Sequence, residues 1–442
     1  MSQLKNLIIC LVLVLSFGPA RARSEVLDGS YKEWLKELNI ETREDLPSEA
    51  GFSDYLSVLL SNNPELRTLY YRWQAAEEKV AIVNAWPDPQ IKAGIAIQPV
   101  VTAQGPQDLR LGLSQVIPRV KERRASTQVQ VHLSEATQAQ LNSRINDLSL
   151  ELKQVYADLY LLGQQLSIQN QVLLLLRNWQ EVLLTRYRSA RADHPDLVKT
   201  QLEVLRLEDQ IQNTEVLLEN TEDELRRLLH LDSRSSLIAP ANLDAGKKLL
   251  LAREPLETVS ENPRLTMERS YREAARKAEA VAISRTRPQL VLGLDWIVTG
   301  NSDLVNPALD AGGDAISLSV GFSLPVWGGK NKAVKASARA ELVAHESKYE
   351  AINHELLVTT SQATRDLKNA ERRIALLEDS LIPKSQEAYN VLETAYTAGN
   401  ADLLSLLDAV EDLLDQQLQL VKANVTLWRA QARLDHLKGI VL

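Results

Sequence analysis

The sequence LVLGLDWIVT, at residues 290–299, carries the clearest structural signal in the chain. Large apolar side chains occupy every second position, and Gly293, Asp295 and Thr299 stand among the residues between them. An alternation with a period of two is the pattern of a β-strand whose two faces meet different surroundings. The segment ISLSVGFSL, at residues 316–324, is stricter still, because every intervening residue is serine or glycine. We therefore expect two strands, each with one apolar face.

Two earlier segments alternate in the same way, IKAGIAIQ at 91–98 and LRLGLS at 109–114. Glycine and proline residues separate the members of each pair, which predicts β-hairpins at 90–117 and 289–326. Each run has about ten residues, the length of a tilted strand that crosses a membrane. An apolar face toward lipid and a polar face toward water is the arrangement in membrane barrels. The alternative is a half-buried sheet that packs on helices in a soluble domain.

The chain consists of two related halves. The motif NPEL at 63–66 recurs as NPRL at 262–265, and PQI at 89–91 recurs as PQL at 288–290 with the same spacing. Two copies of such a long unit indicate duplication of one architectural half. The predicted repeats are residues 53–230 and 263–437. Each contains, in order, a helix, a hairpin, a very long helix, a helical tip and a returning helix.

The helices between the hairpins and the tips are predicted to be unusually long. Residues 119–189 contain no proline, and Gly163 is their one interior helix breaker, so about 70 residues form about 105 Å of helix. Residues 330–398 repeat this pattern with one interruption, at Pro383. Helices of this length belong to coiled coils or tubes. Residues 53–85 are predicted to form one shorter helix.

Four strands in one chain are too few to close a barrel, for which about eight is the practical minimum. The sequence leaves no further amphipathic helix to cover the apolar strand faces. Several chains must therefore pool their hairpins. The predicted fold is mainly α with membrane β, with four strands and long coiled-coil helices in each protomer.

The N-terminus has the features of an export signal. Lys5 precedes the apolar run Leu7–Phe17, and Ala20-Arg21-Ala22 follows it as a cleavage site. We expect a signal peptide at 1–22; the alternative, an N-terminal membrane anchor, is disfavoured because the apolar run is short. Cys10, the only cysteine, lies inside that run, which argues against a lipoprotein. Residues 23–52 form an N-terminal extension to which the sequence assigns no role.

The composition points away from enzymes and nucleic-acid binders. Hydrophobic residues make up 45% of the chain but aromatic residues only 5%, as expected of long helices packed through aliphatic side chains. The net charge of −8 gives no reason to expect a nucleic-acid partner. The six histidines show no metal-ligand spacing, and no phosphate loop or nucleophile motif occurs. We therefore predict no catalytic residue, no metal site and no cofactor.

Several short strings, found in both halves and in the same order, resemble the TolC-like outer-membrane factor family. They are LSQVIP at 113–118 with basic residues after it, LPVWGGK at 324–330, and AYTAGN at 395–400 leading to LLDA at 406–409. The resemblance covers roughly residues 50–440. The surroundings of Asn63-Pro64 and Pro87-Asp88-Pro89 look most like members that serve resistance-nodulation-division pumps for heavy metals or drugs.

This resemblance implies a homotrimeric α/β-barrel. Twelve strands would cross the outer membrane of a Gram-negative bacterium, in contact with its lipid, and twelve helices would form a tube that extends into the periplasm. Residues 231–262, with the tail at 438–442, would form an equatorial belt. The implied partners are a periplasmic adaptor, that is, a membrane fusion protein, and an inner-membrane pump of the resistance-nodulation-division type.

The resemblance also implies candidate gating residues at the periplasmic end. Asp408 matches a ring aspartate, Asp196 a linking aspartate and Tyr396 the tip tyrosine. Carboxylate rings around a symmetry axis select cations. The second ring position is Ser405 and the usual basic partner position is Ala401, so the family's tyrosine, aspartate and arginine lock is incomplete. Candidates to replace the missing group are Arg191, Asp193 and Asp402.

The helix turns at the tips are the implied docking points for the adaptor. They lie at Ala190 and at Gly399 with Asn400, and a glycine is expected where a helix reversal needs a positive φ. The predicted function is that of a passive exit duct for small solutes, either metal cations or drugs. The alternatives are a soluble periplasmic coiled-coil adaptor or scaffold, and the outer-membrane duct of a type I protein secretion system.

Overall fold

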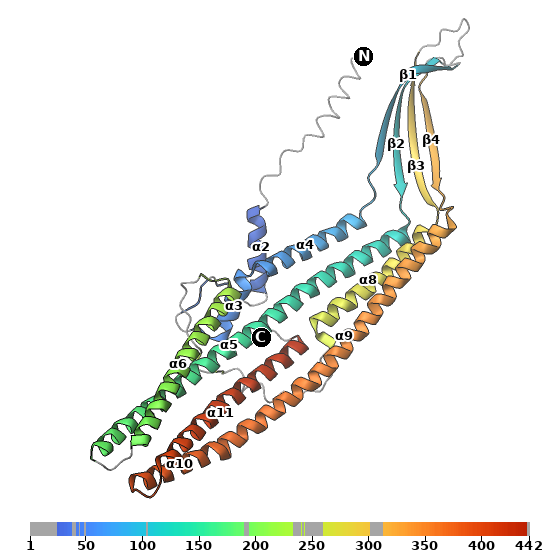
Figure 1. Ribbon diagram of the computed structural model, residues 1–442. Coiled ribbons are helices and arrows are strands. Elements are labelled where there is room, and N and C mark those ends of the chain that lie inside the picture. The colour runs from blue at the N-terminus through green and yellow to red at the C-terminus, as the bar shows by residue number, and fades with distance from the viewer. Residues whose placement is uncertain are drawn as a thin grey trace.

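A long bundle of helices carries a four-stranded sheet at one end in the computed structural model (Figure 1). The described residues are 24–37, 41–43, 45–47, 50–102, 105–189, 194–232, 240, 243, 260–300 and 313–439. The predicted signal peptide, most of the predicted equatorial segment and tail residues 440–442 lie outside them. Ala190, Arg191 and Asp193 lie outside them as well.

The two halves of the chain contain corresponding elements. The first half comprises α3 (Phe52–Asn62), α4 (Pro64–Asn84), β1 (Gln90–Thr102), β2 (Gly105–Ile117), α5 (Val120–Arg188) and α6 (His194–Leu229). The second comprises α8 (Pro263–Arg285), β3 (Gln289–Thr299), β4 (Ala315–Ser323), α9 (Gly328–Leu376), the π-helical turn η2 (Leu377–Leu381), α10 (Ile382–Thr397) and α11 (Leu403–Lys438). One further helix, α2 (Ser24–Glu37), precedes both halves.

The sheet is antiparallel, with the strand order β1-β2-β3-β4. The two hairpins are therefore joined edge to edge through β2 and β3, with Leu113 opposite Leu294 and Gly112 opposite Asp295. The second hairpin ends at Ser323, three residues before the predicted end at 326. In Figure 1 the strands extend away from the helices, and no described helix covers either face of the sheet.

Each half pairs one long helix with shorter helices laid end to end. In the first half, α3, α4 and α6 contain 11, 21 and 36 residues, together nearly as many as the 69 of α5. Figure 1 shows α4 beside the sheet end of α5 and α6 beside its other end. Among the described helices, none is both long enough and apolar enough to cross a membrane.

The prediction of one continuous helix over residues 53–85 is wrong, because the chain breaks at Asn63. The Asn63 side chain accepts hydrogen bonds from the backbone N–H groups of Glu65 and Leu66, at 2.9 and 3.1 Å. Pro64 then opens α4, where its missing N–H costs nothing. Asn262 caps α8 in the same way, so the repeated Asn-Pro pair is a helix start in both halves.

The largest buried cluster lies at mid-length of the bundle and includes the N-terminal extension. Tyr31 of α2 is buried, and its hydroxyl donates a 2.7 Å hydrogen bond to the carbonyl of Leu60. Its ring packs edge-on against Tyr70 of α4 at 5.3 Å. The helix α2 is thus part of the main core.

Candidate functional site

The register of the four strands divides the sheet into two unlike faces. Residues directly opposite each other on paired strands point to the same face. One face carries Ile91, Ala93, Ile95, Leu109, Leu111, Leu113, Leu290, Leu292, Leu294, Trp296, Val298, Ile316, Leu318, Val320 and Phe322. Its polar exception is Gln115, near the helices, whose amide donates to the carbonyl of Pro87 at 2.8 Å.

The apolar face is uncovered in the single chain. Ile95, Leu318 and Phe322 expose 79%, 77% and 64% of their surface. Soluble monomers rarely present a continuous apolar patch of this extent. The face therefore has the character of a surface that contacts lipid or another apolar partner.

The opposite face is polar or made of small residues, apart from a few aliphatic positions. It carries Gln90, Lys92, Gly94, Arg110, Gly112, Ser114, Gln289, Gly293, Asp295, Ser317, Ser319, Gly321 and Ser323. Arg110 forms an ion pair with Asp295 across β2 and β3, at 3.2 Å. A Cβ atom at Gly112 would lie 2.7 Å from an Asp295 carboxylate oxygen, so glycine leaves room for this pair.

The far end of the bundle is the second candidate region, where the end of α5 lies beside the turn between α10 and α11. Gly399 has a φ of 80°, and the N–H of Asn400 donates to the carbonyl of Ala395 at 2.8 Å. Two predicted gating residues, Asp402 and Ser405, form a hydrogen bond with each other at the start of α11. Asp402 is the N-cap residue, and the hydroxyl of Ser405 donates to its carboxylate at 2.6 Å, which holds the pKa of Asp402 below its ordinary value.

Tyr396 is buried at the end of α10, with 7% of its surface exposed. Its ring packs edge-on against Trp179 of α5 at 5.7 Å. Burial raises the pKa of the Tyr396 hydroxyl, Arg186 lowers it, and the negative charge of Asp196 raises it. Asp196, in the first turn of α6, thus lies within electrostatic reach of Tyr396, whereas Asp408 is exposed on α11.

Arg186 of α5 is a tip residue that the sequence did not single out. Its guanidinium carbon lies 5.1 Å from the centre of the Tyr396 ring, and one of its nitrogens donates to the carbonyl of Thr397 at 3.4 Å. Arg186 and Trp179 are two helical turns apart, so both lie on the same side of α5. The position of Trp179 and Arg186 on one face of the predicted helix is the sequence feature that could have indicated a role for Arg186.

A cavity of about 400 Å³ lies between α5, α6 and α11 near the tips. Its apolar lining includes Leu176 and Leu407, and its charged rim includes Glu203 and Glu411. Burial raises the pKa of Glu411, and the neighbouring carboxylates of Glu203 and Asp408 raise it further. Glu203 of α6 and Glu411 of α11 thus place two carboxyl groups near each other in this cavity.

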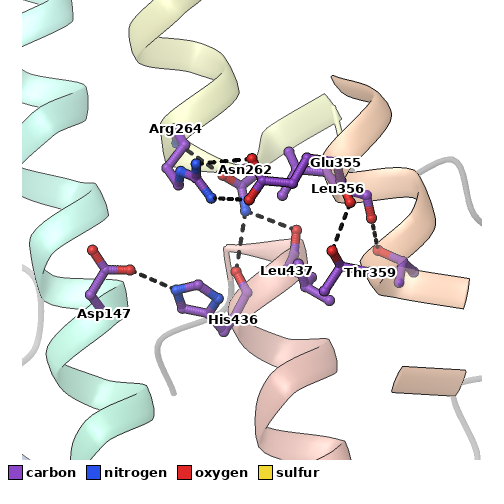
Figure 2. A network of polar contacts seen from close by, with 9 residues as sticks. Asp147, Asn262, Arg264, Glu355, Leu356, Thr359, His436 and Leu437 are labelled. Atoms are coloured by element: carbon purple, nitrogen blue, oxygen red, sulfur yellow. Dashed lines mark hydrogen bonds and ion pairs between the residues drawn. The ribbon is translucent and has the colours of Figure 1, made fainter. Parts of the chain in front are cut away.

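A polar network at mid-length holds the second half to α5 (Figure 2). The Asn262 amide donates to the carbonyls of His436 and Leu437, at 3.3 and 3.0 Å. The ring of His436 lies 2.7 Å from Asp147 of α5. Arg264 of α8 forms a two-point ion pair with Glu355 of α9. These contacts hold α8, α9 and the end of α11 together at mid-length of the bundle.

The described residues contain no group of three or more histidine, cysteine, aspartate or glutamate side chains placed to bind a metal ion.

Comparison with known proteins identifies the fold. Residues 256–439 match the family model of the outer membrane efflux protein. The outer-membrane channel OprN is 21% identical with a TM-score of 0.75, and the alignment covers 88% of this chain and 89% of OprN. VceC of Vibrio cholerae is 17% identical with a TM-score of 0.73, covering 88% and 96%. The open state of the MtrE channel of Neisseria gonorrhoeae is 17% identical with a TM-score of 0.71, covering 88% of each chain.

None of the curated protein sequences compared with the chain matches it. The predicted TolC-like fold is confirmed by the solved structures. The chain therefore has the TolC-like channel fold, and its second half resembles the outer membrane efflux protein family.

Proposed function

We propose that the protein is the outer-membrane exit duct of an efflux system, a passive channel for small solutes such as metal cations or drugs. The division of the four-stranded sheet into an apolar and a polar face is the observation that carries this proposal. A continuous apolar face suits hydrocarbon, and a face of serine, glycine and a few charges suits a water-filled lumen.

The duct is a homotrimer in this proposal. Within one chain, β1 and β4 are the two edges of the sheet, and unpaired strand edges inside a bilayer leave backbone groups without partners. Pairing β1 of one chain with β4 of the next removes both edges. Three chains give twelve strands, enough to close a barrel around an aqueous channel.

The partners are proposed from the fold and the family. The helical tips near residue 190 and at Gly399 and Asn400 dock a periplasmic adaptor, and the adaptor connects the duct to an inner-membrane pump of the resistance-nodulation-division type. The pump supplies the energy. The duct itself opens by a shift between closed and open states when the adaptor binds.

Asp408 is proposed to form the carboxylate ring at the closed end. It is exposed on α11, and three-fold symmetry would bring three copies around one axis. Asp402 and Ser405 support the ring indirectly, because their mutual hydrogen bond fixes the start of α11. Tyr396 and Asp196 link the two tips.

Reconstitution into planar lipid bilayers tests the proposal. We expect detergent-purified trimers to give discrete conductance steps, and Asp408→Ala to raise the conductance and reduce block by multivalent cations. Purification as a detergent-independent monomer would contradict the duct and favour a soluble scaffold. Conducting channels with unchanged block in the variant would contradict the role of Asp408 alone.

A further inference from the structure

The segments that join the four strands to the helices lie at one edge of the sheet. β1 and β3 begin at this edge, and β2 and β4 end at it (Figure 1). Hydrogen bonds connect neighbouring segments: the guanidinium of Arg119 donates to the carbonyl of Pro288 at 3.2 Å, and that of Arg123 donates to the carbonyl of Asn84 at 3.4 Å. We call residues 84–89, 118–124, 285–288 and 324–335 the joining segments.

The joining segments are strongly basic, although the net charge of the whole chain is −8. They contain nine lysine and arginine residues but two acidic residues, Asp88 and Glu122. Glu122 is shared by Arg119 and Arg285, at 2.6 and 3.7 Å. Six exposed basic side chains form no hydrogen bond or ion pair with any residue that the structure describes: Lys121, Arg124, Arg287, Lys330, Lys332 and Lys335. Their charges are therefore available to a partner outside the chain.

The loop end of the sheet differs in charge from the helix end. Its described residues, between 99 and 108 and between 298 and 316, include Asp108 and Asp314 but no lysine or arginine. The excess of basic side chains thus belongs to one edge of the sheet, where the strands meet the helices.

Exposed apolar and aromatic side chains accompany these charges. Leu324 and Val326 are exposed just beyond the end of β4, and Trp327 exposes 73% of its surface. Trp86 is exposed as well, and the guanidinium carbon of Arg123 lies 5.9 Å from the centre of its ring. Tryptophan is enriched at the membrane–water interface, where its ring lies at the level of the lipid headgroups. The joining segments thus extend the apolar face of the sheet with side chains that suit the headgroup layer.

The spacing of the lysines on α9 places charge on more than one side of this helix. Lys330 and Lys332 are two positions apart, about 200° around the helix axis. In the wall of a tube they cannot both face the lumen. Lys121 and Arg123 have the same spacing at the start of α5.

We propose that the joining segments bind the headgroups of anionic phospholipids on the periplasmic side of the outer membrane. This inference rests on the proposed function as a duct, in which the apolar face of the sheet lies in hydrocarbon. Lysine and arginine form charge-assisted hydrogen bonds with phosphate oxygens. Each basic side chain near the surface of an anionic membrane strengthens binding about fivefold.

Spin-labelled lipids test this inference. Phosphatidylglycerol and phosphatidylcholine with the same acyl-chain label are each added to trimers in phosphatidylcholine vesicles, and lipid in contact with protein gives a motionally restricted spectrum. We expect a preference for phosphatidylglycerol, measured as the ratio of the two association constants. This ratio should fall toward one at about 1 M salt, where the Debye length is about 3 Å.

A triple variant and a matched control locate the effect. Lys330→Gln/Lys332→Gln/Lys335→Gln should lower the ratio by up to about fivefold for each lysine that faces outward. Lys368→Gln/Lys384→Gln/Lys422→Gln removes the same charge from exposed positions on α9, α10 and α11 away from the sheet, and should leave the ratio unchanged. An equal fall in both variants would assign the preference to net charge and would overturn the inference.

Further outcomes separate this inference from the proposed function. Equal restriction of the two lipids by the unaltered trimer would overturn the inference and leave the duct in place. An unchanged ratio in the first variant, with a reversal potential that moves toward cation selectivity in planar bilayers, would place these lysines in the lumen and would also overturn it. A protein that restricts neither lipid does not contact the bilayer, and this result would refute the duct itself.

Discussion

Placing an arginine on the apolar face of the sheet should prevent assembly in the membrane. Leu318 is the fourth of nine residues in β4, lies opposite Leu294 and is 77% exposed in the single chain. If this face meets lipid, Leu318→Arg puts a charge near the middle of the bilayer, at a cost of about 2–4 kcal/mol. That corresponds to a roughly thirty- to several-hundred-fold loss of inserted chain. A trimer carries three copies of the penalty.

The neighbouring position supplies the matched control. Ser319 lies on the polar face, opposite Gly293, where a longer side chain can extend over the glycine. Ser319→Arg should cost little, because its charge stays in water. The assay is the fraction of trimer in outer-membrane extracts, measured by chemical cross-linking. Equal trimer yields for the two variants, or a larger loss for Ser319→Arg, would refute the assignment of the faces.

Two further predictions concern charged residues in the helical part. Asp435→Ala should lower the free energy of unfolding by about 3–5 kcal/mol, because it leaves the buried Lys153 without its ion-pair partner at 3.4 Å. The double variant Lys153→Met/Asp435→Leu removes both charges, and its urea unfolding midpoint should return to that of the unaltered protein. A midpoint for Asp435→Ala equal to that of the unaltered protein would contradict this explanation. The pKa of Glu411 is raised in the folded state, so the folded protein is most stable when this carboxyl is protonated. The stability that the protonated carboxyl contributes is therefore present at low pH. It is lost as the pH rises above about 4.5 and through the folded-state pKa. Glu411→Gln should therefore raise the melting temperature more at pH 7.5 than at pH 4.5, while the exposed Asp412→Asn should show no such difference; an equal gain at both pH values would show that the charge of Glu411 is not responsible.

The strands and the long helices could be predicted because their signals are local. Serine or glycine at every second position of 316–324 predicts a β-strand with one apolar face. The proline-free stretch before Arg188 similarly predicts one long helix, and α5 ends at that residue. The duplicated halves strengthened both predictions, since each signal occurs twice.

The missed features depend on contacts between distant residues or on ambiguous local signals. Proline is tolerated at the start of a helix, so the Asn63-Pro64 pair is compatible with either a helix start or the interior of a predicted helix that bends. The helix α2 is stabilised by the contacts of Tyr31 with Leu60 and Tyr70, which no local pattern contains. Arg186 meets Tyr396 from the other half of the chain, so only the folded structure brings this pair together.

The orientation of the sheet in the bilayer is the central claim, and spin-label accessibility along β4 tests it most directly. Single labels at residues 316–323, in protein reconstituted into lipid vesicles, are exposed in turn to oxygen, which concentrates in hydrocarbon, and to a water-soluble nickel complex. We expect oxygen to dominate at Ile316, Leu318, Val320 and Phe322 and the nickel complex to dominate at the serine and glycine positions between them. Access of the nickel complex to all eight positions alike would contradict a strand with one face toward lipid.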